Sequence, residues 1–187
     1  MCLNTQTKNT NQLTTKSIPS KTMAKITLKG NTINTSGSLP EVGSKAKDFE
    51  LIAGDLSTKS ISDFQGQNLV LNIFPSLDTG TCAASVRNFN KAAAELNNTS
   101  VLCISRDLPF AQKRFCGAEG IENVVMLSDF KTGQFGKDYG LDIVDGPLAG
   151  LNSRSIIIIN AEGMVTYTQQ VAETSEEPDY EDALNSL

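Results

Sequence analysis

Four apolar runs of strand length alternate with segments of helical periodicity, and this alternation limits the folds open to the chain. The runs are Leu69–Phe74, Ser100–Ser105, Val124–Leu127 and Ser155–Asn160. Between the first two runs, Val86, Phe89, Ala93 and Leu96 recur at the three- and four-residue spacings of an amphipathic helix. Strands that alternate with helices favour an α/β protein whose central sheet is covered by helices on both faces.

Four helices and several shorter strands complete the expected order. The expected helices cover Ala83–Asn97, Pro109–Gly117, Thr132–Tyr139 and Asp179–Leu187. A short strand is expected at Asp48–Ile52, and Lys25–Lys29 with Thr32–Thr35 predicts an N-terminal β-hairpin around a Gly-Asn turn. Val165–Thr168 pairs with the last apolar run ahead of the final helix. This closing β-β-α order favours a thioredoxin-like mixed sheet over a wholly parallel one.

The first 22 residues differ in composition from the rest of the chain. Met1–Thr22 is rich in Thr, Asn, Lys, Ser and Gln and poor in apolar residues, which is typical of a disordered tail. The tail lacks the apolar core of a secretory signal. Its basic character keeps an organellar transit peptide open, although the absence of Arg counts against one. We expect a single folded domain over Met23–Leu187, and Met23 is a candidate for its true start.

Charge and hydropathy argue against two kinds of partner. The net charge is −5 and no run of Lys or Arg stands out, so we expect no nucleic-acid partner. No stretch approaches the roughly 18 apolar residues of a membrane span, so we expect no membrane partner either.

The chain contains no histidine and four cysteines, which are Cys2, Cys82, Cys103 and Cys116. The lack of histidine rules out Ser-His-Asp and Cys-His catalysis and most zinc sites. The cysteines form no C-x-x-C pair, so neither a metal knuckle nor a local dithiol is expected. Two structural disulfides in a secreted protein remain an alternative, which the missing signal peptide disfavours.

Cys82 lies where a buried strand ends and a helix is expected to begin. A cysteine in the first turn of a helix faces unpaired backbone N–H groups and the positive end of the helix dipole. Both favour the thiolate over the thiol, so we expect Cys82 to be a nucleophile. Cys103 lies inside an apolar strand, where a buried structural thiol is expected instead.

Three segments carry a resemblance to a known enzyme family. The spacing Pro-x-x-x-Thr-x-x-Cys, at Pro75, Thr79 and Cys82, resembles the peroxiredoxins. The segments Asn72–Arg87, Leu108–Ile121 and Glu177–Glu181 are similar, in the same order, to the thiol peroxidase subfamily of bacterial atypical two-cysteine peroxiredoxins. The resemblance covers about residues 23–187. It implies a thioredoxin-like fold and a peroxidase that reduces hydrogen peroxide and organic hydroperoxides.

The resemblance also implies a role for each motif residue. Cys82 would be the peroxidatic thiol, which attacks the peroxide and becomes a sulfenic acid. Thr79 would orient sulfur and peroxide through its hydroxyl, and Pro75 would shield the pocket from water. Arg154, which opens a late strand, would stabilise the thiolate and the departing alkoxide. Cys116 would be the resolving thiol, and we expect local unwinding to bring it into an intrachain disulfide with Cys82.

The partners implied by the resemblance are a hydroperoxide, thioredoxin as reductant and a second copy of the chain in a homodimer. No cofactor is implied because sulfur carries the electrons, and a bacterial cytoplasmic location is expected. Two alternatives remain open. A general thiol–disulfide oxidoreductase is disfavoured because Thr79 stands where the first cysteine of its motif would be, whereas a redox sensor or holdase would use the same oxidation of Cys82. Arg87 is expected to be a surface charge, and Asp78 has no expected catalytic role.

Overall fold

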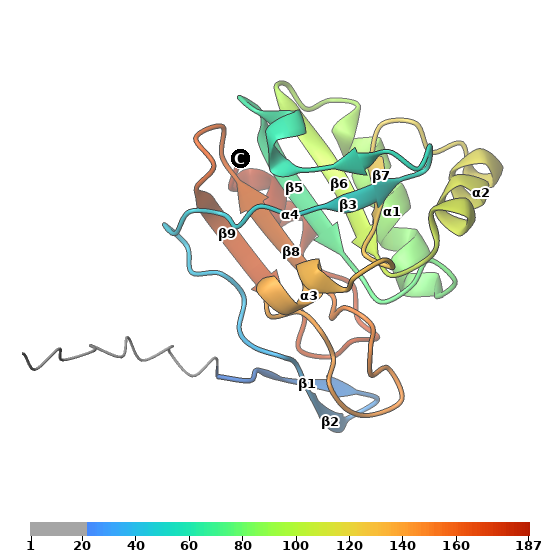
Figure 1. Ribbon diagram of the computed structural model, residues 1–187, viewed down its shortest axis with the longest axis vertical. Helices are drawn as coiled ribbons and strands as arrows, with labels where there is room; N and C mark the ends of the chain where they lie inside the picture. Colours follow the sequence, from blue (N-terminus) through green and yellow to red (C-terminus); the bar gives the residue numbers. More distant parts are fainter. Residues whose placement is uncertain (1–21) are drawn as a thin grey trace, which may run out of the picture.

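A seven-stranded mixed sheet forms the centre of the molecule in the computed structural model, which describes residues 22–187 (Figure 1). The strands are β3 (Leu51–Ala53), β4 (Thr58–Lys59), β5 (Asn68–Ile73), β6 (Thr99–Ser105), β7 (Val125–Ser128), β8 (Ser155–Ile159) and β9 (Val165–Gln170), in the spatial order β4-β3-β7-β6-β5-β8-β9. Parallel pairing joins β5 to β6 and β6 to β7, and the other pairs are antiparallel. The expected mixed α/β arrangement is therefore confirmed, while residues 1–21 of the expected tail lie outside the described residues.

Helices cover both faces of the sheet (Figure 1). One face packs against α1 (Gly80–Ala93), α2 (Pro109–Glu119) and α4 (Tyr180–Asn185), and the other against the 3-10 helix η1 (Ile61–Phe64) and α3 (Gln134–Asp138). Successive side chains of a strand point to opposite faces. Along β5, Val70 accordingly joins the core under α1, whereas Leu71 joins the core under α3.

The N-terminal hairpin forms a separate two-stranded sheet, as expected. Its strands are β1 (Lys25–Leu28) and β2 (Asn31–Asn34). The carboxylate of Glu173 attaches the turn to the main body, because it accepts hydrogen bonds from the backbone N–H groups of Lys29 at 2.9 Å and Gly30 at 3.0 Å. The hairpin is thus fixed to the segment that follows β9.

Two expected elements differ from the structure by three or more residues at an end. The strand expected at Asp48–Ile52 is displaced to Leu51–Ala53, and the Asp48 carboxylate instead accepts from the backbone N–H of Ile61. The helix expected at Ala83–Asn97 begins at Gly80, because Thr79 caps it, and ends at Ala93. The strand β4 and the helix η1 were not expected, because they are short and carry little apolar pattern.

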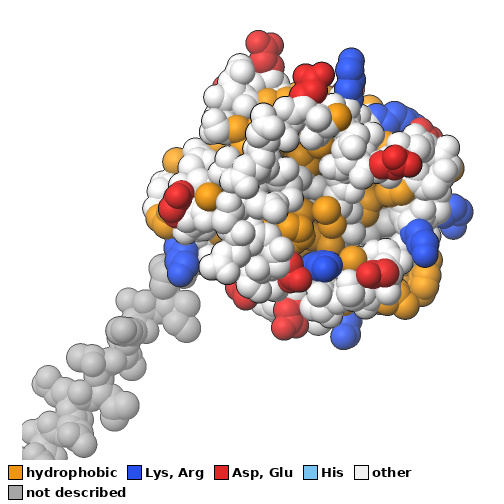
Figure 2. All heavy atoms as spheres, turned by 90° about the horizontal axis from the view of Figure 1, so that it is seen from above, with side chains coloured by type: hydrophobic (Ala, Val, Ile, Leu, Met, Phe, Trp, Pro, Cys, Tyr) orange, Lys and Arg blue, Asp and Glu red, His pale blue; other side chains and the backbone are white. Residues whose placement is uncertain are grey.

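The surface of the described part carries both charge signs. Figure 2 shows acidic and basic side chains scattered singly over the face seen from above, with hydrophobic side chains exposed between them. Within residues 22–187, no helix is both long enough and apolar enough to cross a membrane.

Candidate active site

Cys82 lies in the first turn of α1, just beyond the carboxyl end of β5, and its side chain is fully buried. Thr79 is the N-cap, and its Oγ1 accepts from the backbone N–H of Cys82 at 3.4 Å. The same hydroxyl donates to the carbonyl of Ser76 at 3.2 Å. Pro75 is buried between β5 and this turn. The structure therefore brings Pro75, Thr79 and Cys82 together, although the Thr79 hydroxyl contacts the backbone of Cys82 rather than its sulfur.

Arg154 reaches the same place from the neighbouring strand. Ile73 pairs with Ser155, so Arg154 lies beside the point where β5 ends. Its Nη2 lies 3.4 Å from Cys82 Sγ, and the side chain is buried, with 2% of the residue exposed. Within residues 22–187 no carboxylate forms an ion pair with Arg154. The charge of this buried cation is therefore not neutralised by a carboxylate within residues 22–187, and it lies beside the Cys82 sulfur.

The guanidinium of Arg154 is oriented by a backbone carbonyl. Nε and Nη2 donate to the carbonyl of Thr174 at 3.2 and 3.1 Å. Among the described residues, Nη1 is buried and has no hydrogen-bond partner. The edge of the guanidinium formed by Nε and Nη2 is therefore held in place. The N–H groups of Nη1 remain available to an oxygen bound near Cys82 Sγ.

The segment that carries Thr174 is itself fixed by Glu173 and the hairpin. The Thr174 N–H donates to the carbonyl of Thr27 at 2.8 Å. The Glu173 carboxylate accepts from Ser175 Oγ at 2.6 Å and from the hairpin turn, and these hydrogen bonds lower the pKa of Glu173. On the other side, Thr81 Oγ1 donates to the carbonyl of Ser175 at 3.1 Å. The hairpin thus supports the carbonyl that orients Arg154.

Asp107 holds the loop before α1, a role that was not expected from the sequence. Its Oδ1 accepts from Ser76 Oγ at 2.7 Å, and its Oδ2 accepts from the backbone N–H of Leu77 at 2.8 Å. The signal was present in the sequence, since Asp107 follows β6 at the same carboxyl edge of the parallel strands as Cys82. An acidic residue directly after a buried strand is nevertheless too common to be singled out.

Cys116 forms no disulfide with Cys82. Cys82, Cys103 and Cys116 are all free thiols, and Cys2 lies outside the described residues. Cys116 lies in α2, is half-buried, and lines an open hollow of about 400 Å³ together with Lys113. Burial raises the pKa of the Cys116 thiol. A larger hollow of about 490 Å³ lies between η1 and the β8–β9 turn, and none of Cys82, Cys103 and Cys116 lines it.

Cys103 lies in β6, fully buried, as its apolar surroundings predict. Asn72 Nδ2 contacts Cys103 Sγ at 3.5 Å, and Asn72 Oδ1 accepts from Ser85 Oγ at 2.8 Å. Burial raises the pKa of Cys103 to about 12. A thiol that stays protonated is a poor nucleophile, so the environment of Cys103 fits a structural residue.

Arg87 is exposed and forms an ion pair with Glu119 at the end of α2, at 2.9 Å. This contact joins α1 to α2, so the expected surface position of Arg87 is confirmed. Asp78 is also exposed.

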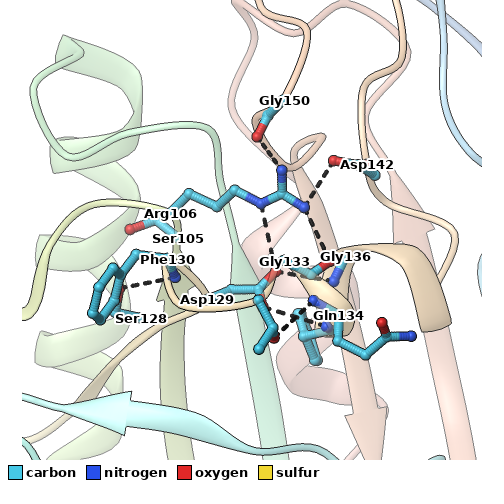
Figure 3. A network of polar contacts seen from close by, with 12 residues as sticks. Ser105, Arg106, Ser128, Asp129, Phe130, Gly133, Gln134, Gly136, Asp142 and Gly150 are labelled. Carbon is cyan, nitrogen blue, oxygen red and sulfur yellow. Dashed lines mark hydrogen bonds and ion pairs between the residues drawn. The ribbon is translucent and has the colours of Figure 1, made fainter.

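A second arginine organises the segment that leads to Arg154 (Figure 3). The Arg106 guanidinium donates to the carbonyls of Gly150 and Gly133 and forms ion pairs with Asp129 and Asp142. Burial raises the pKa of Asp129, and the N–H of Gly136 and the charge of Arg106 oppose that rise. Arg106 therefore joins α3 to the chain that runs into β8.

Comparisons with known proteins show the family of the chain. A sequence model of the family described as Redoxin matches residues 41–184. The thiol peroxidases of Mycobacterium tuberculosis and Corynebacterium glutamicum are each 56% identical to this chain over 165 residues, which are 88% of this chain and 99% of each relative.

Solved structures give the same result. A peroxiredoxin-like protein from Aquifex aeolicus superposes with a TM-score of 0.82 and 38% identity, over 87% of this chain and 95% of that one. A thiol peroxidase from Chromobacterium violaceum, 22% identical, shares the fold with a TM-score of 0.77 over 86% of this chain and 93% of its own. With a buried thiol at a helix N-terminus beside a buried arginine, the chain belongs to the redoxin family, as a peroxiredoxin-type thiol peroxidase of the thioredoxin-like superfamily.

Proposed function

We propose that Cys82 is the peroxidatic thiol of this enzyme and that it reduces hydrogen peroxide and organic hydroperoxides. The observation that carries the proposal is the buried Arg154 guanidinium, whose Nη2 lies 3.4 Å from Cys82 Sγ. Its Nη1 has no acceptor among the described residues. It can therefore donate to a peroxide oxygen while Nη2 stabilises the thiolate.

The first step is a two-electron transfer from sulfur to the peroxide. The Cys82 thiolate attacks the distal oxygen of ROOH, so an S–O bond forms and the O–O bond breaks. Cys82 becomes a sulfenic acid, and the leaving alkoxide takes up a proton to give an alcohol, or water from hydrogen peroxide. Arg154 stabilises the negative charge that develops on the leaving oxygen. Thr79 holds the first turn of α1 in place, and buried Pro75 excludes water behind it.

Cys116 resolves the sulfenic acid in this proposal. Its thiol attacks the Cys82 sulfur, an S–S bond forms, and the hydroxyl leaves as water with the thiol proton. Disulfide geometry requires Cα atoms within about 7 Å, so the segments around both cysteines unwind first. A dithiol reductant then exchanges with the disulfide, which returns both thiols and oxidises the reductant. Thioredoxin is the proposed reductant.

The assembly and location follow the same proposal. Leu108 and Phe110 are large apolar residues that are 51% and 62% exposed, and they support a homodimer because burial of such side chains favours association. We place the protein in a bacterial cytoplasm, where a thioredoxin system is at hand.

The purified full chain tests this function directly. With hydrogen peroxide and a thioredoxin system, it should consume peroxide over many turnovers, and one equivalent of peroxide should give a single intrachain Cys82–Cys116 disulfide by mass spectrometry. Stoichiometric oxidation without recycling would favour the redox-sensor alternative instead. A disulfide found only between chains, or to Cys2 or Cys103, would contradict the resolving role of Cys116.

Arg154→Met tests the charge beside the thiol. The change keeps an apolar stem of similar length but removes every donor, so the rate of Cys82 oxidation should fall about a hundredfold. Stopped-flow oxidation at several peroxide concentrations measures this rate. Arg87→Met is the matched control, because Arg87 is an exposed arginine of the same helix as Cys82 and pairs with Glu119. If Cys82 were oxidised at the parent rate in both variants, another cation would stabilise the reaction in place of Arg154.

A further inference from the structure

Asp107 lies between the two segments that carry the reacting cysteines. It follows β6 and directly precedes Leu108, the N-cap residue of α2, which bears Cys116. Its carboxylate accepts from Ser76 Oγ and from the Leu77 N–H, in the loop that leads to Cys82. One half-buried side chain therefore joins the peroxidatic loop to the start of the resolving helix.

The contacts continue from this carboxylate to the thiol. Ser76, which Asp107 holds, provides the carbonyl that accepts from both the N–H and the Oγ1 of Thr79, each at 3.2 Å. Thr79 Oγ1 in turn accepts from the N–H of Cys82 at 3.4 Å. The position of Cys82 in its first turn thus depends on a chain of hydrogen bonds that begins at Asp107.

Asp107, where this series of hydrogen bonds begins, is itself held by residues of the sheet and of α2. Asp107 Oδ2 also accepts from Ser105 Oγ at 2.7 Å, and the Asp107 carbonyl accepts from Ser128 Oγ. Gln112 of α2 donates to the same Ser105 hydroxyl at 3.1 Å. Asp107 is therefore fixed to β6, β7 and α2, whereas its contacts with Ser76 and Leu77 are the ones that separate when the loop before α1 moves.

We propose that Asp107 is a positioning residue that holds the Ser76–Cys82 loop in its peroxide-reactive form and releases it before Cys82 can reach Cys116. The inference rests on the proposed function, because it assigns opposite effects to the two steps of that cycle. Hydrogen bonds to a carboxylate are stronger than neutral ones. Their loss would raise the population of the unwound loop, which forms the disulfide, and would loosen the folded loop, which reacts with peroxide.

The test compares both rates in Asp107→Ala, which removes every side-chain acceptor. Disulfide formation, seen by stopped-flow fluorescence or quenched-flow mass spectrometry as a phase independent of peroxide concentration, should become about tenfold faster. Oxidation of Cys82 should become several-fold slower, and the fraction of sulfinic acid at a fixed excess of peroxide should fall. Asp107→Asn retains the shape and one acceptor oxygen, so it should give intermediate values in all three measurements.

Asp63→Ala is the matched control. The Asp63 carboxylate also accepts from a backbone N–H and a serine hydroxyl, both of Ser60, but it lies at η1, before the amino end of β5. Both rates should stay at the parent value in this variant. Unchanged rates in Asp107→Ala, or a parallel fall of both, would overturn the positioning role. If Asp107→Ala does not fold, Asp107→Asn is measured instead. Faster disulfide formation together with slower Cys82 oxidation in that variant supports the positioning role, and unchanged rates overturn it. A parent protein that consumes no peroxide would instead count against the proposed function.

Discussion

Replacing Cys82 with Ser is expected to abolish peroxide consumption while the protein stays folded. Only the thiolate sulfur is a strong enough nucleophile to break the O–O bond, and a serine hydroxyl stays protonated at neutral pH. The buried site should tolerate the change, because Ser Oγ can accept the hydrogen bond that Arg154 Nη2 now gives to sulfur. Peroxide loss followed with a thioredoxin system measures activity, and thermal unfolding measures the fold.

Cys103→Ser is the control for that substitution, since it replaces a second fully buried thiol on the same face of the sheet. It should cost stability rather than activity, because a hydroxyl in an apolar strand has a desolvation cost that a thiol lacks. Near-normal turnover in Cys82→Ser, or complete loss of turnover in a well-folded Cys103→Ser, would contradict the assignment of these two cysteines.

Cys116→Ser should leave the first oxidation of Cys82 fast but stop thioredoxin-driven turnover. Without Cys116 the sulfenic acid has no resolving partner among residues 22–187, because the other thiol there, Cys103, is fully buried and its pKa is raised to about 12. The sulfenic acid should then persist long enough to be trapped with a dimedone-type probe. Excess peroxide should drive it to the irreversible sulfinic and sulfonic states.

Mass spectrometry after graded peroxide distinguishes the outcomes for Cys116→Ser. The parent protein should stop at the disulfide under conditions in which the variant accumulates the higher oxides. Sustained turnover in the variant would mean that the reductant attacks the sulfenic acid directly, and the resolving role of Cys116 would then be wrong. The peroxidatic role of Cys82 would not be affected by that result.

The sequence predicted the architecture because most of its strands are apolar on both faces. The strand β8 consists of Ser155 and four isoleucines, and all five residues are buried. A run of this kind fits a central strand that is covered on both faces. The displaced β3 shows the limit of such patterns. Asp48–Ile52 contains alternating apolar residues, but the contact of Asp48 with Ile61 is a tertiary one that no local pattern contains.

Part of the site could also be predicted from the sequence, and part could not. Pro75, Thr79 and Cys82 are close in sequence, so their motif predicts their grouping, and the family resemblance supplied Arg154. Asp107 and the Thr174 carbonyl act through hydrogen bonds between distant segments. A backbone carbonyl carries no residue type at all, so the sequence holds no sign of the group that orients Arg154.

Protonation of Glu173 would affect the surroundings of Arg154, because Glu173 holds the N-terminal hairpin beside the Thr174 carbonyl that orients the arginine. Because hydrogen bonds lower the pKa of Glu173 below the ordinary value of 4.5, the folded chain binds a proton there less readily than the unfolded chain. The stabilisation is therefore complete above about pH 4.5 and is lost as the pH falls through the lower, folded pKa. Acid would weaken the contacts of Glu173 with Lys29 and Gly30. The carbonyl that orients the arginine would then lose part of its support.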